Sequence, residues 1–432
     1  MTNRVEFKLD RGAIDKAVPN DASSKAAFVA GELGCAAAGA TRVFRPAGKH
    51  EAAHRRHGLD LWYSTACGAT AAATRDAVRT FVDRVVVLRN ASAVAASGLI
   101  TVLEADRAPH KDATHSNDPL LDHQTHYDAI DLFDAWDVER GSSSEVIVSI
   151  VDSGIDVSHE DLQVNLWTNP GEDCDGGSES MNGIDDDDNG FTDDCHGFNH
   201  ARGVPAPLHS DDDAHGTHVA GTVAADTDNA VGGAGVAGGA AGAPGARLMV
   251  NRIFDGALQG SGETAEAITY GADMGARISQ NSWSLTQAAG FPRVLRDAID
   301  YAVDAKDVVV VFSAGNNGWD RPTFPAAYAK TVAVAAADNT GRATWFTNYG
   351  DWIDITAPGA HVFSTVPGGY DYKDGTSMAA PHVAGVAALM LAANPAMTRH
   401  DVVACLASTA TPIDAVNPSS KRGRLGAGML DA

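Results

Sequence analysis

Several kinds of residue are scarce in this chain, and each scarcity excludes a class of protein. Five cysteines in 432 residues are too few, and odd in number, for a scaffold built from disulfides. The longest nearly unbroken apolar run covers only residues 383–393, about half of the roughly 20 residues that cross a bilayer, so we expect no membrane span. Basic residues number 32 against 56 acidic ones, which disfavours nucleic acid and anionic lipid as partners.

The chain is long enough for two or three domains, and its charge is unevenly distributed. The net charge is −24, but residues 1–116 carry +4 and residues 117–432 carry −28. The stretch 107–116 is polar and lacks apolar periodicity, which is typical of an exposed linker. We therefore predict a domain boundary between residues 116 and 117.

Beyond this boundary, apolar strand-like runs alternate with helix-like stretches. The runs cover residues 146–151, 247–254, 277–281, 308–312, 332–336 and 352–356. Between these runs, apolar residues recur at the spacing of a helix, for example over residues 264–275 and 294–305. This alternation predicts an α/β fold of three α/β/α layers with a mostly parallel central sheet. In such sheets functional residues gather at the carboxyl ends of the strands.

Three short motifs place reactive side chains at such strand ends and at helix starts. Asp152 ends the first run, His215 and His218 stand three apart at the start of a small-residue helix, and Ser377 opens an apolar helix. Taken alone, Asp152 could cap a turn, and the two histidines share a helix face and could bind a metal. Pro381 lies near the start of the last helix, where proline breaks a hydrogen bond, and this marks the segment for function.

Asp, His and Ser in this chain order resemble the triad of the subtilases, the subtilisin-like serine proteases. The resemblance is carried by residues 151–156, 215–222 and 375–385, and it extends over residues 117–432. It implies a subtilisin-like α/β fold and a serine endopeptidase that hydrolyses peptide bonds through an acyl-enzyme intermediate.

The resemblance also implies individual roles. Ser377 would attack the scissile carbonyl, His215 would take and return the proton, and Asp152 would hold the imidazole in the right tautomer. Asn316, just after an apolar run, would donate its side-chain N–H to the developing oxyanion, with the backbone N–H of Ser377 as second donor. His218 matches the second, non-catalytic histidine of the family, which removes the metal-pair interpretation.

Substrate-binding residues follow from the same resemblance. Two extended segments would hold the substrate as an added strand, flanked by the wall and floor of the first side-chain pocket. The residues so implied are Gly260, Ser261, Gly262, Ser282, Trp283 and Ser284 in the extended segments, Ala314 and Gly315 in the wall, and Thr323 at the floor. Subtilases usually have glycine at the position of Ser284, so a tighter pocket is expected. Residues 281–283 are similar to the kexin branch, which cuts after basic pairs, but the bacterial-style segment 313–318 makes that specificity the minor alternative.

Residues 172–196 form an acidic loop with ten acidic and no basic side chains. Oxygen-bearing residues alternate ahead of Gly190, as in the first half of a calcium loop, but His196 stands where an EF-hand needs glutamate. Mutual repulsion and the number of flexible oxygens favour calcium, the alternative being a solvated acidic loop. Cys174 and Cys195 bracket this loop, and the sequence leaves their pairing open. The predicted ligands are Asp185, Asp187, Asn189 and Asp193.

A second calcium site rests on resemblance alone. Residues 227–233 align with the calcium loop of subtilases, so one or two ions are expected in all. The implied ligands are the side chains of Asn229 and Asp161 and the backbone carbonyls of Thr227, Val231 and Gly233, with Gln124 completing the site.

Residues 1–116 have the length of the propeptide that in subtilases assists folding and blocks the cleft until it is cut. We predict a small α+β domain here, with residues 102–106 running into the active site. Its +4 charge is attracted by the −28 of the remainder. We therefore expect the propeptide to act as an intramolecular inhibitor and the chain to cut itself between about Asp106 and Asn117.

The expected partners are polypeptide substrates and the chain's own propeptide, and we expect a monomer. The family implies secretion, or a place in the endomembrane system or periplasm, although residues 1–10 mix charges where a signal peptide would be apolar. Two alternatives differ in class from the protease: a catalytically silent binding module with the same fold, and a serine esterase or transacylase using the same triad.

Overall fold

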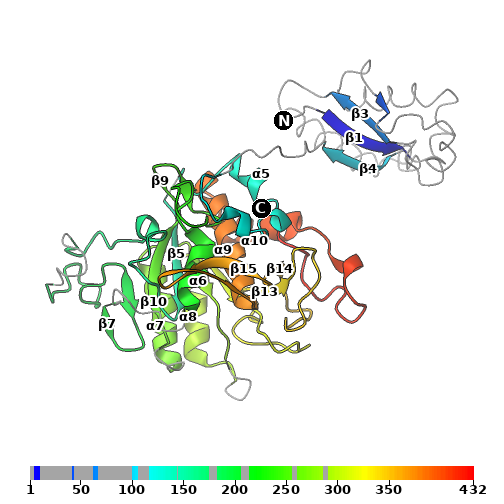
Figure 1. Ribbon diagram of the computed structural model, residues 1–432. Helices are drawn as coiled ribbons and strands as arrows, with labels where there is room; N and C mark the ends of the chain where they lie inside the picture. The colour runs from blue at the N-terminus through cyan, green and yellow to red at the C-terminus, as the bar shows by residue number, and fades with distance from the viewer. Residues whose placement is uncertain are drawn as a thin grey trace. The chain divides into compact units, whose positions relative to one another are not determined.

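The computed structural model (Figure 1) separates the chain into two compact units, Met1–Ala113 and Thr114–Ala432. The predicted boundary, between residues 116 and 117, lies three residues further along the chain. The residues that the structure describes are 4–9, 41–42, 62–66, 100–105, 116–143, 145–174, 182–205, 214–254, 260–285 and 290–432.

The described part of the first unit is a four-stranded antiparallel sheet. Its strands, in sheet order, are β2 (Thr41–Arg42), β3 (Trp62–Ala66), β1 (Arg4–Leu9) and β4 (Ile100–Ala105). Residues 102–105, predicted to run toward the active site, thus belong to the edge strand β4. The prediction of helices in this domain concerns residues outside the described ones, and so does most of the expected cleavage region, residues 106–115.

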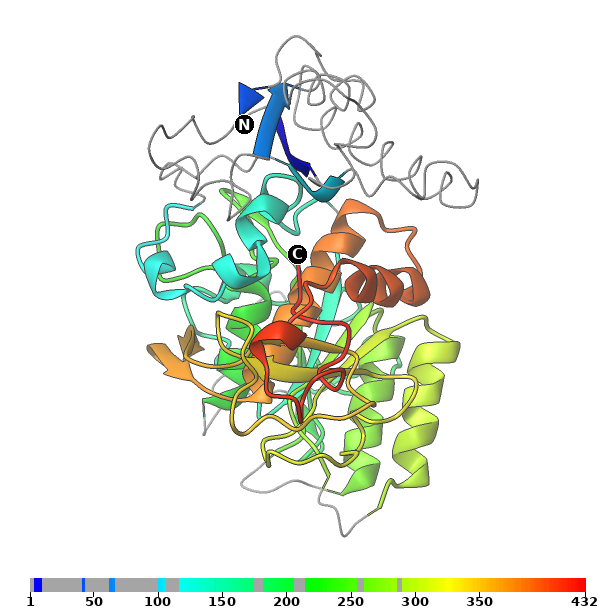
Figure 2. The same ribbon diagram turned by 90° about the vertical axis from the view of Figure 1, so that its right-hand side faces the viewer.

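A mostly parallel eight-stranded sheet forms the centre of the second unit (Figures 1 and 2). Its strands, in sheet order, are β14 (Ile355–Pro358), β13 (Val332–Ala337), β12 (Val309–Ser313), β11 (Ile278–Asn281), β5 (Ile147–Asp152), β10 (Arg247–Arg252), β6 (Gly197–Asn199) and β7 (Val204–Pro205). All neighbours pair in parallel except β6 and β7. The predicted α/β sheet is confirmed. The last run was placed too early, because β14 begins only at Ile355.

Helices cover the sheet in two groups. Helix α6 (His215–Ala224) packs against α9 (Thr376–Ala393), and α9 crosses β11 to β14. Helix α7 (Ser261–Asp273) packs against α8 (Arg293–Asp304), α7 lying against β5 and β10 and α8 against β12. The smaller elements are α5 (Leu132–Trp136), α10 (Arg399–Thr409), the hairpins β8 (Gly239–Ala240) with β9 (Ala243–Pro244) and β15 (Val362–Val366) with β16 (Gly369–Lys373), and the 3-10 turns Leu121–His123, Asp128–Ile130, Gln163–Asn165 and Asp414–Val416.

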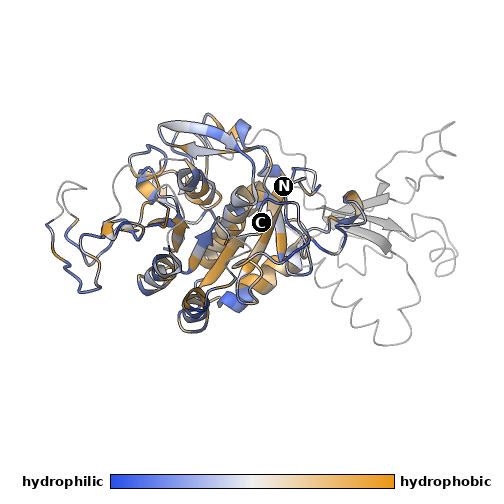
Figure 3. Cartoon of the chain, turned by 90° about the horizontal axis from the view of Figure 1, so that it is seen from below, coloured by the Kyte–Doolittle hydropathy of each residue, from blue (hydrophilic) through white to orange (hydrophobic). Residues whose placement is uncertain are grey.

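Helix α9 is the centre of the hydrophobic core. Among the described residues it is the single helix long and apolar enough to cross a membrane, but 89% of it is buried inside the fold. Small residues allow this burial: a Cβ on Gly385 would stand 2.5 Å from the Val236 side chain. Figure 3 shows hydrophobic residues concentrated on the central strands around it. The composition of α9 therefore reflects core packing.

Three fully buried histidines lie in and beside the helix pair α6 and α9. A ring nitrogen of His382 donates to the Met378 carbonyl at 2.9 Å, and one of His218 donates to the Val362 carbonyl at 3.0 Å. The His126 ring packs edge-on against His382, with 4.9 Å between centroids. Burial lowers the pKa of His382 to about 4, that of His218 to about 3 and that of His126 well below its usual range. All three imidazoles are therefore neutral at neutral pH.

We expect the free energy of unfolding to fall as the pH drops from about 6.5 toward 4. Each buried ring is neutral in the folded protein and regains the ordinary histidine pKa of about 6.5 on unfolding. The unfolded chain thus binds more protons over this interval, and each ring costs up to about 1.4 kcal/mol per pH unit. For His382 the loss levels off near its folded pKa of about 4. Urea unfolding of a Ser377→Ala protein from pH 7 to 4.5 measures the slope.

His382→Gln is the comparison for this slope, because it keeps polarity but does not titrate. The variant should be less stable at pH 7 and should lose stability less steeply below pH 6.5. Equal slopes in the two proteins would show that His382 does not contribute.

Candidate active site

The end of β5 and the start of α6 bring a carboxylate and an imidazole together. Asp152 is the last residue of β5 and His215 the first of α6. The Asp152 Oδ1 accepts a hydrogen bond from His215 Nδ1 at 2.6 Å. The aspartate side chain is 1% exposed and the histidine side chain 29%. A buried carboxylate thus orients a partly exposed ring through Nδ1, leaving Nε2 as the nitrogen for proton transfer.

Residues next to this pair hold the two elements at contact distance. Ser153 Oγ accepts the backbone N–H of Gly216 at 2.9 Å, which ties the first turn of α6 to the loop after β5. A Cβ on Gly216 would lie 2.0 Å from the Gly154 carbonyl oxygen. Glycine after His215 is therefore a packing requirement that allows the helix to begin against the strand end.

Ser377 is the second residue of α9 and is 9% exposed. Its Oγ donates to the backbone carbonyl of Ser282 at 3.2 Å, while Ser282 Oγ donates to the Ser377 carbonyl at 2.7 Å. Pro381 explains why that carbonyl is available, since proline has no N–H for the carbonyl four residues earlier. Pro381 therefore leaves the Ser377 carbonyl without a helical donor, and the Ser282 hydroxyl donates to this carbonyl instead.

Asn316 lies in the segment that follows β12. Its Oδ1 accepts both the backbone N–H and the hydroxyl of Thr376, each at 2.9 Å. A Cβ on Gly375 would stand 3.5 Å from both Asn316 Nδ2 and the backbone nitrogen of Ser377. Two N–H donors therefore border the same space at the N-terminus of α9, where helix amides lack partners of their own.

The predicted pocket wall and floor meet at one buried side chain. Asn348 Nδ2 donates to the Ala314 carbonyl at 2.9 Å and to Thr323 Oγ1 at 3.0 Å. Gly315 has φ +100°, and a Cβ there would lie 2.6 Å from Asn348 Nδ2, so only glycine fits. Sequence analysis missed Asn348, because it lies outside every recognisable motif.

The predicted substrate-binding segments need two corrections. Ser261 and Gly262 are not extended but form the first turn of α7, and only Gly260 has extended backbone. Trp283 is 5% exposed and packs edge-on against Phe312, with 5.0 Å between ring centroids, so its side chain belongs to the core. The neighbouring Ser284 is exposed. Serine and glycine occur both in extended segments and at the start of helices. Residue type alone therefore did not distinguish an extended segment from the first turn of α7.

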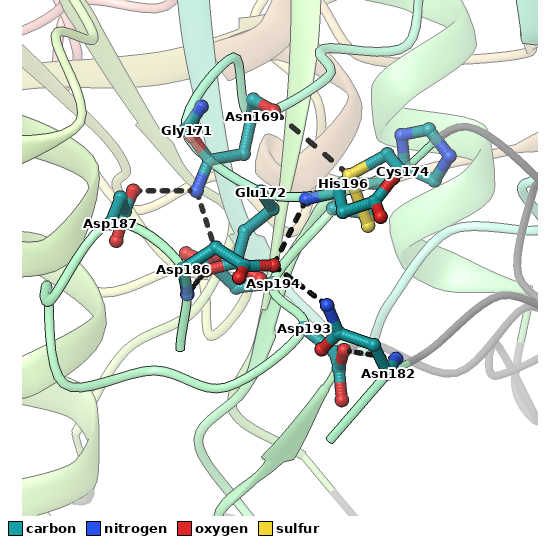
Figure 4. Close-up of a disulfide and its surroundings, with 12 residues drawn as sticks. Asn169, Gly171, Glu172, Cys174, Asn182, Asp186, Asp187, Asp193, Asp194 and His196 are labelled. Atoms are coloured by element: carbon teal, nitrogen blue, oxygen red, sulfur yellow. Dashed lines mark hydrogen bonds between the residues drawn. A yellow bond between two sulfur atoms is a disulfide. The ribbon is translucent and has the colours of Figure 1, made fainter. Parts of the chain in front are cut away.

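A disulfide between Cys174 and Cys195 closes the acidic loop (Figure 4). Beside it, carboxylate oxygens of Glu172, Asp187 and Asp194 all lie within 4.8 Å of one another. Glu172 and Asp194 are buried, and burial raises the pKa of both carboxyl groups. This carboxylate cluster could hold a metal ion.

The carboxylate cluster differs from the ligand set predicted for this loop. Asp185 accepts the backbone N–H groups of Asn189 at 3.1 Å and Gly190 at 2.8 Å. Asp193 accepts the backbone N–H of Asn182 at 2.9 Å. These two carboxylates shape the turn, so of the predicted side chains Asp187 alone belongs to the cluster.

Polar side chains hold the buried end of the carboxylate cluster. Asp194 is fully buried and accepts hydrogen bonds from Asn169 Nδ2 at 2.7 Å, Asn189 Nδ2 at 3.0 Å and the Tyr270 hydroxyl at 2.5 Å. Asn169 Nδ2 also contacts Asp187 Oδ2 at 3.0 Å. The amides orient the carboxylates without adding charge, so the repulsion between them is not neutralised by these partners.

Asp161 is a buried carboxylate outside the cluster, and one of its two oxygens accepts no hydrogen bond from the described residues. Its Oδ1 accepts Asn229 Nδ2 at 2.8 Å, but its Oδ2 has no hydrogen-bond partner among the described residues. Burial raises the pKa of Asp161 to about 8. A small pocket is lined by Asp161 together with Gln124 and Gly233. Of the predicted calcium ligands, these three residues lie together. Asn229 directs its side-chain nitrogen toward Asp161, and a side-chain nitrogen that donates a hydrogen bond is not a calcium ligand.

The first described residues of the second unit are fastened to this loop. Asp118 accepts the backbone N–H groups of Asp228 at 2.8 Å and Asn229 at 3.0 Å. Leu120 N–H donates to the Gly232 carbonyl at 2.7 Å. Ser116 and Asp118 are 6% and 5% exposed, so the chain is already part of the fold from Ser116 onward.

The chain is similar to a known family model, to individual proteins and to solved structures. A family model described as the subtilase family matches residues 143–428. A thermophilic serine proteinase from Bacillus sp. (strain AK1) is 37% identical over 295 residues, covering 67% of this chain and 62% of that protein, which is less than two thirds of its length. Thermitase from Thermoactinomyces vulgaris is 34% identical over 298 residues, covering 68% and 90%. A solved protease from Pseudoalteromonas arctica has a TM-score of 0.54 at 30% identity, covering 73% of this chain and 97% of its own.

Proposed function

The chain belongs to the subtilase family, and from that premise we propose that it is a serine endopeptidase using Asp152, His215 and Ser377. The observation that carries the proposal is the 2.6 Å hydrogen bond from His215 to buried Asp152. A serine hydroxyl is a weak nucleophile unless an oriented base stands by it, and the His215 imidazole, oriented by Asp152, would be that base for Ser377.

In the first step Ser377 Oγ rotates from the Ser282 carbonyl toward His215 and attacks the carbonyl carbon of the scissile peptide. His215 Nε2 takes the hydroxyl proton as the C–O bond forms, and Asp152 stabilises the resulting imidazolium without taking the proton itself. The negative charge moves to the former carbonyl oxygen. Asn316 Nδ2 and the Ser377 backbone N–H would donate to that oxygen, and the position of both nitrogens 3.5 Å from a Cβ on Gly375 supports this.

In the second step the tetrahedral intermediate expels the amine. The C–N bond breaks, His215 gives its proton to the leaving nitrogen, and an ester of Ser377 remains. Water then attacks the ester carbon while His215 removes one of its protons, and the same two donors hold the second oxyanion. The bond between the carbon and Ser377 Oγ breaks, His215 returns its proton to Oγ, and the new carboxylic acid leaves.

We propose that the substrate lies as an added strand beside the 282–284 segment and Gly260, with its side chain in the pocket of Ala314, Gly315 and Thr323. The exposed Ser284 and the buried wall residue Ala314 support this placement. Main-chain hydrogen bonds would give affinity and the pocket would give side-chain preference.

We propose two calcium sites with structural roles. Glu172, Asp187 and Asp194 fit a hard cation because their oxygens already converge. Asp161 fits because its Oδ2 is buried without a partner among the described residues, beside the Gln124 side chain. At both sites calcium would neutralise buried carboxylates, and it would take no part in bond cleavage.

We infer that residues ahead of Ser116 act as a removable propeptide. The cut must leave Ser116 in place, because Ser116 and Asp118 are buried and bonded to the 228–232 loop. The expected window therefore narrows from about Asp106–Asn117 to the part before Ser116. The Cys174–Cys195 disulfide supports export to an oxidising compartment, where such bonds persist.

The wild-type protein should hydrolyse a fluorogenic peptide, and Ser377→Ala should lower kcat by about 10⁴-fold or more. Turnover should rise with pH, because the imidazole must be neutral to act as base. Ser408→Ala, an exposed serine of α10, is the control and should keep wild-type rates. A short ester assayed in parallel tests the esterase alternative. If only the ester is cleaved, the esterase alternative is favoured. If neither the peptide nor the ester is cleaved, the proposal that the protein is an enzyme is contradicted.

Calcium should raise the melting temperature of Ser377→Ala protein after dialysis against a chelator. Saturation at about 100 times the dissociation constant corresponds to about 2.7 kcal/mol for each site. Glu172→Gln and Asp161→Asn should each remove part of the shift in differential scanning calorimetry, whereas Asp137→Asn, an exposed acid elsewhere, should keep it. A melting temperature insensitive to calcium would contradict both sites.

Purified wild-type protein should lose its N-terminal unit, and Ser377→Ala should stay at full length. Intact mass spectrometry would give the mature N-terminus, which should lie between about residue 106 and Ser116. Mixing labelled Ser377→Ala with wild type tests whether cutting occurs between molecules. An uncut wild-type chain with active peptidase, or a cut beyond Asp118, would contradict the proposed maturation.

A further inference from the structure

Asn348 is a buried amide whose hydrogen-bonding capacity is completely used. It lies between β13 and β14 and is 0% exposed. Its Nδ2 donates to the Ala314 carbonyl at 2.9 Å and to Thr323 Oγ1 at 3.0 Å. Its Oδ1 accepts the backbone N–H groups of Asn317 at 3.0 Å and Trp319 at 3.1 Å. An asparagine side chain can make four such bonds, and here all four are made.

The bonds of Asn348 fall on both sides of Asn316. Ala314 precedes Asn316 by two residues and Asn317 follows it directly. The backbone N–H of Asn348 adds a bond to the Gly315 carbonyl at 2.9 Å. Four of the six residues from 314 to 319 are therefore held by one residue, and Asn316 is carried between them.

Asn348 is itself fixed from the opposite side. The neighbouring Tyr349 N–H donates to the Trp319 carbonyl at 3.0 Å. The Tyr349 ring lies under two cations, with Lys421 Nζ 5.2 Å and Arg424 Cζ 5.6 Å from its centroid. Arg424 also pairs with Asp320, the residue that directly follows the segment 314–319. The segment 314–319 is thus fastened to the C-terminal part of the fold through residues 348 and 349.

We propose that Asn348 is the positioning residue that sets both the placement of the Asn316 amide and the shape of the first side-chain pocket. The inference rests on the proposed protease function and deepens it. Asn348 touches neither the substrate nor the reacting atoms. It acts by joining the wall at Ala314 to the floor at Thr323, so that one side chain links oxyanion stabilisation to side-chain preference.

Removing the amide should disturb both properties together. Asn348→Ala would leave the buried Ala314 carbonyl and the part-buried N–H groups of Asn317 and Trp319 without this partner, which is costly unless the segment moves. Displacement of a catalytic group by about 1 Å can cost about 100-fold in rate. We therefore expect a lower kcat for every substrate and a weaker preference among residues before the scissile bond.

The test compares Asn348→Ala with Asn165→Ala. Asn165 is also 0% exposed, and its amide bonds the Ala224 and Gly238 carbonyls at 3.0 Å and the Gly245 N–H at 2.7 Å. Both variants lose a buried, hydrogen-bonded amide, but only one touches the 314–319 segment. kcat and KM are measured on peptides with alanine, leucine or phenylalanine before the scissile bond, and stability is measured by urea unfolding.

Asn348→Ala should lower kcat about 10- to 100-fold and should compress the ratio of kcat/KM between the best and worst peptide. Its affinity for a peptide boronic acid, which mimics the tetrahedral intermediate, should fall in parallel with kcat/KM. Asn165→Ala should lose stability but keep kcat within about threefold and keep the ratio. A merely structural role of Asn348 would lower stability in both variants and leave kcat and the ratio unchanged.

Thr323→Val provides the test if Asn348→Ala does not fold. Valine removes the acceptor of the Asn348 amide at nearly constant volume, and it should lower both kcat and the affinity for the peptide boronic acid. Wild-type kcat and preference in Asn348→Ala, or in Thr323→Val where that variant is used, overturn this inference alone. A wild-type protein without Ser377-dependent turnover overturns the proposed function, and this inference falls with it.

Discussion

The hydrogen bond between Asp152 and His215 is the contact on which the arrangement of the site depends. It requires a carboxylate that is nearly inaccessible to water, at 1% exposure, to stay beside a ring at the surface. Burying a charge in this way is unfavourable unless donors are fixed around it, and the backbone N–H of Ser153 supplies a second one at 2.8 Å. The close approach of Gly216 to Gly154 keeps the donors in place. The first turn of α6 and the end of β5 therefore behave as one rigid piece.

The parallel sheet brings the remaining groups to this piece. Strand β11 lies between β5 and β12 in the sheet; β5 ends at Asp152, and the segments after β11 and β12 contribute Ser282 and Asn316. Helix α9 enters from the same edge, where Ser282 takes the carbonyl that Pro381 leaves without a helical donor. Ser282 and Asn316 are thus held by α9 as well as by their own strands, which gives the preorganisation that catalysis by fixed dipoles needs.

The sequence was informative where a feature is local and uninformative where it depends on distant segments. Apolar runs in a covered parallel sheet are continuous, so β5 and β10 to β13 were recognisable within one or two residues. The Asp152, His215 and Ser377 motifs stand out because close packing demands glycine and small residues around them. In contrast, the carboxylate cluster of Glu172, Asp187 and Asp194 forms only when the disulfide-closed loop folds back, and alternating positions along the loop predicted a different set. Asn348 has no local signal, since its partners lie 25 to 34 residues away.

The segment 116–120, which begins the described part of the second unit, has a consequence for how this unit unfolds. Its hydrogen bonds run to the 228–232 loop; Asn229 of that loop donates to Asp161, and the next residue after the loop, Gly233, lines the pocket of Asp161. Fraying of residues 116–120 would therefore loosen one wall of the pocket. A ligand bound in the pocket would raise the activation barrier for unfolding that begins at residues 116–120. Resistance to proteolysis would then depend on the rate of unfolding as well as on the unfolding equilibrium.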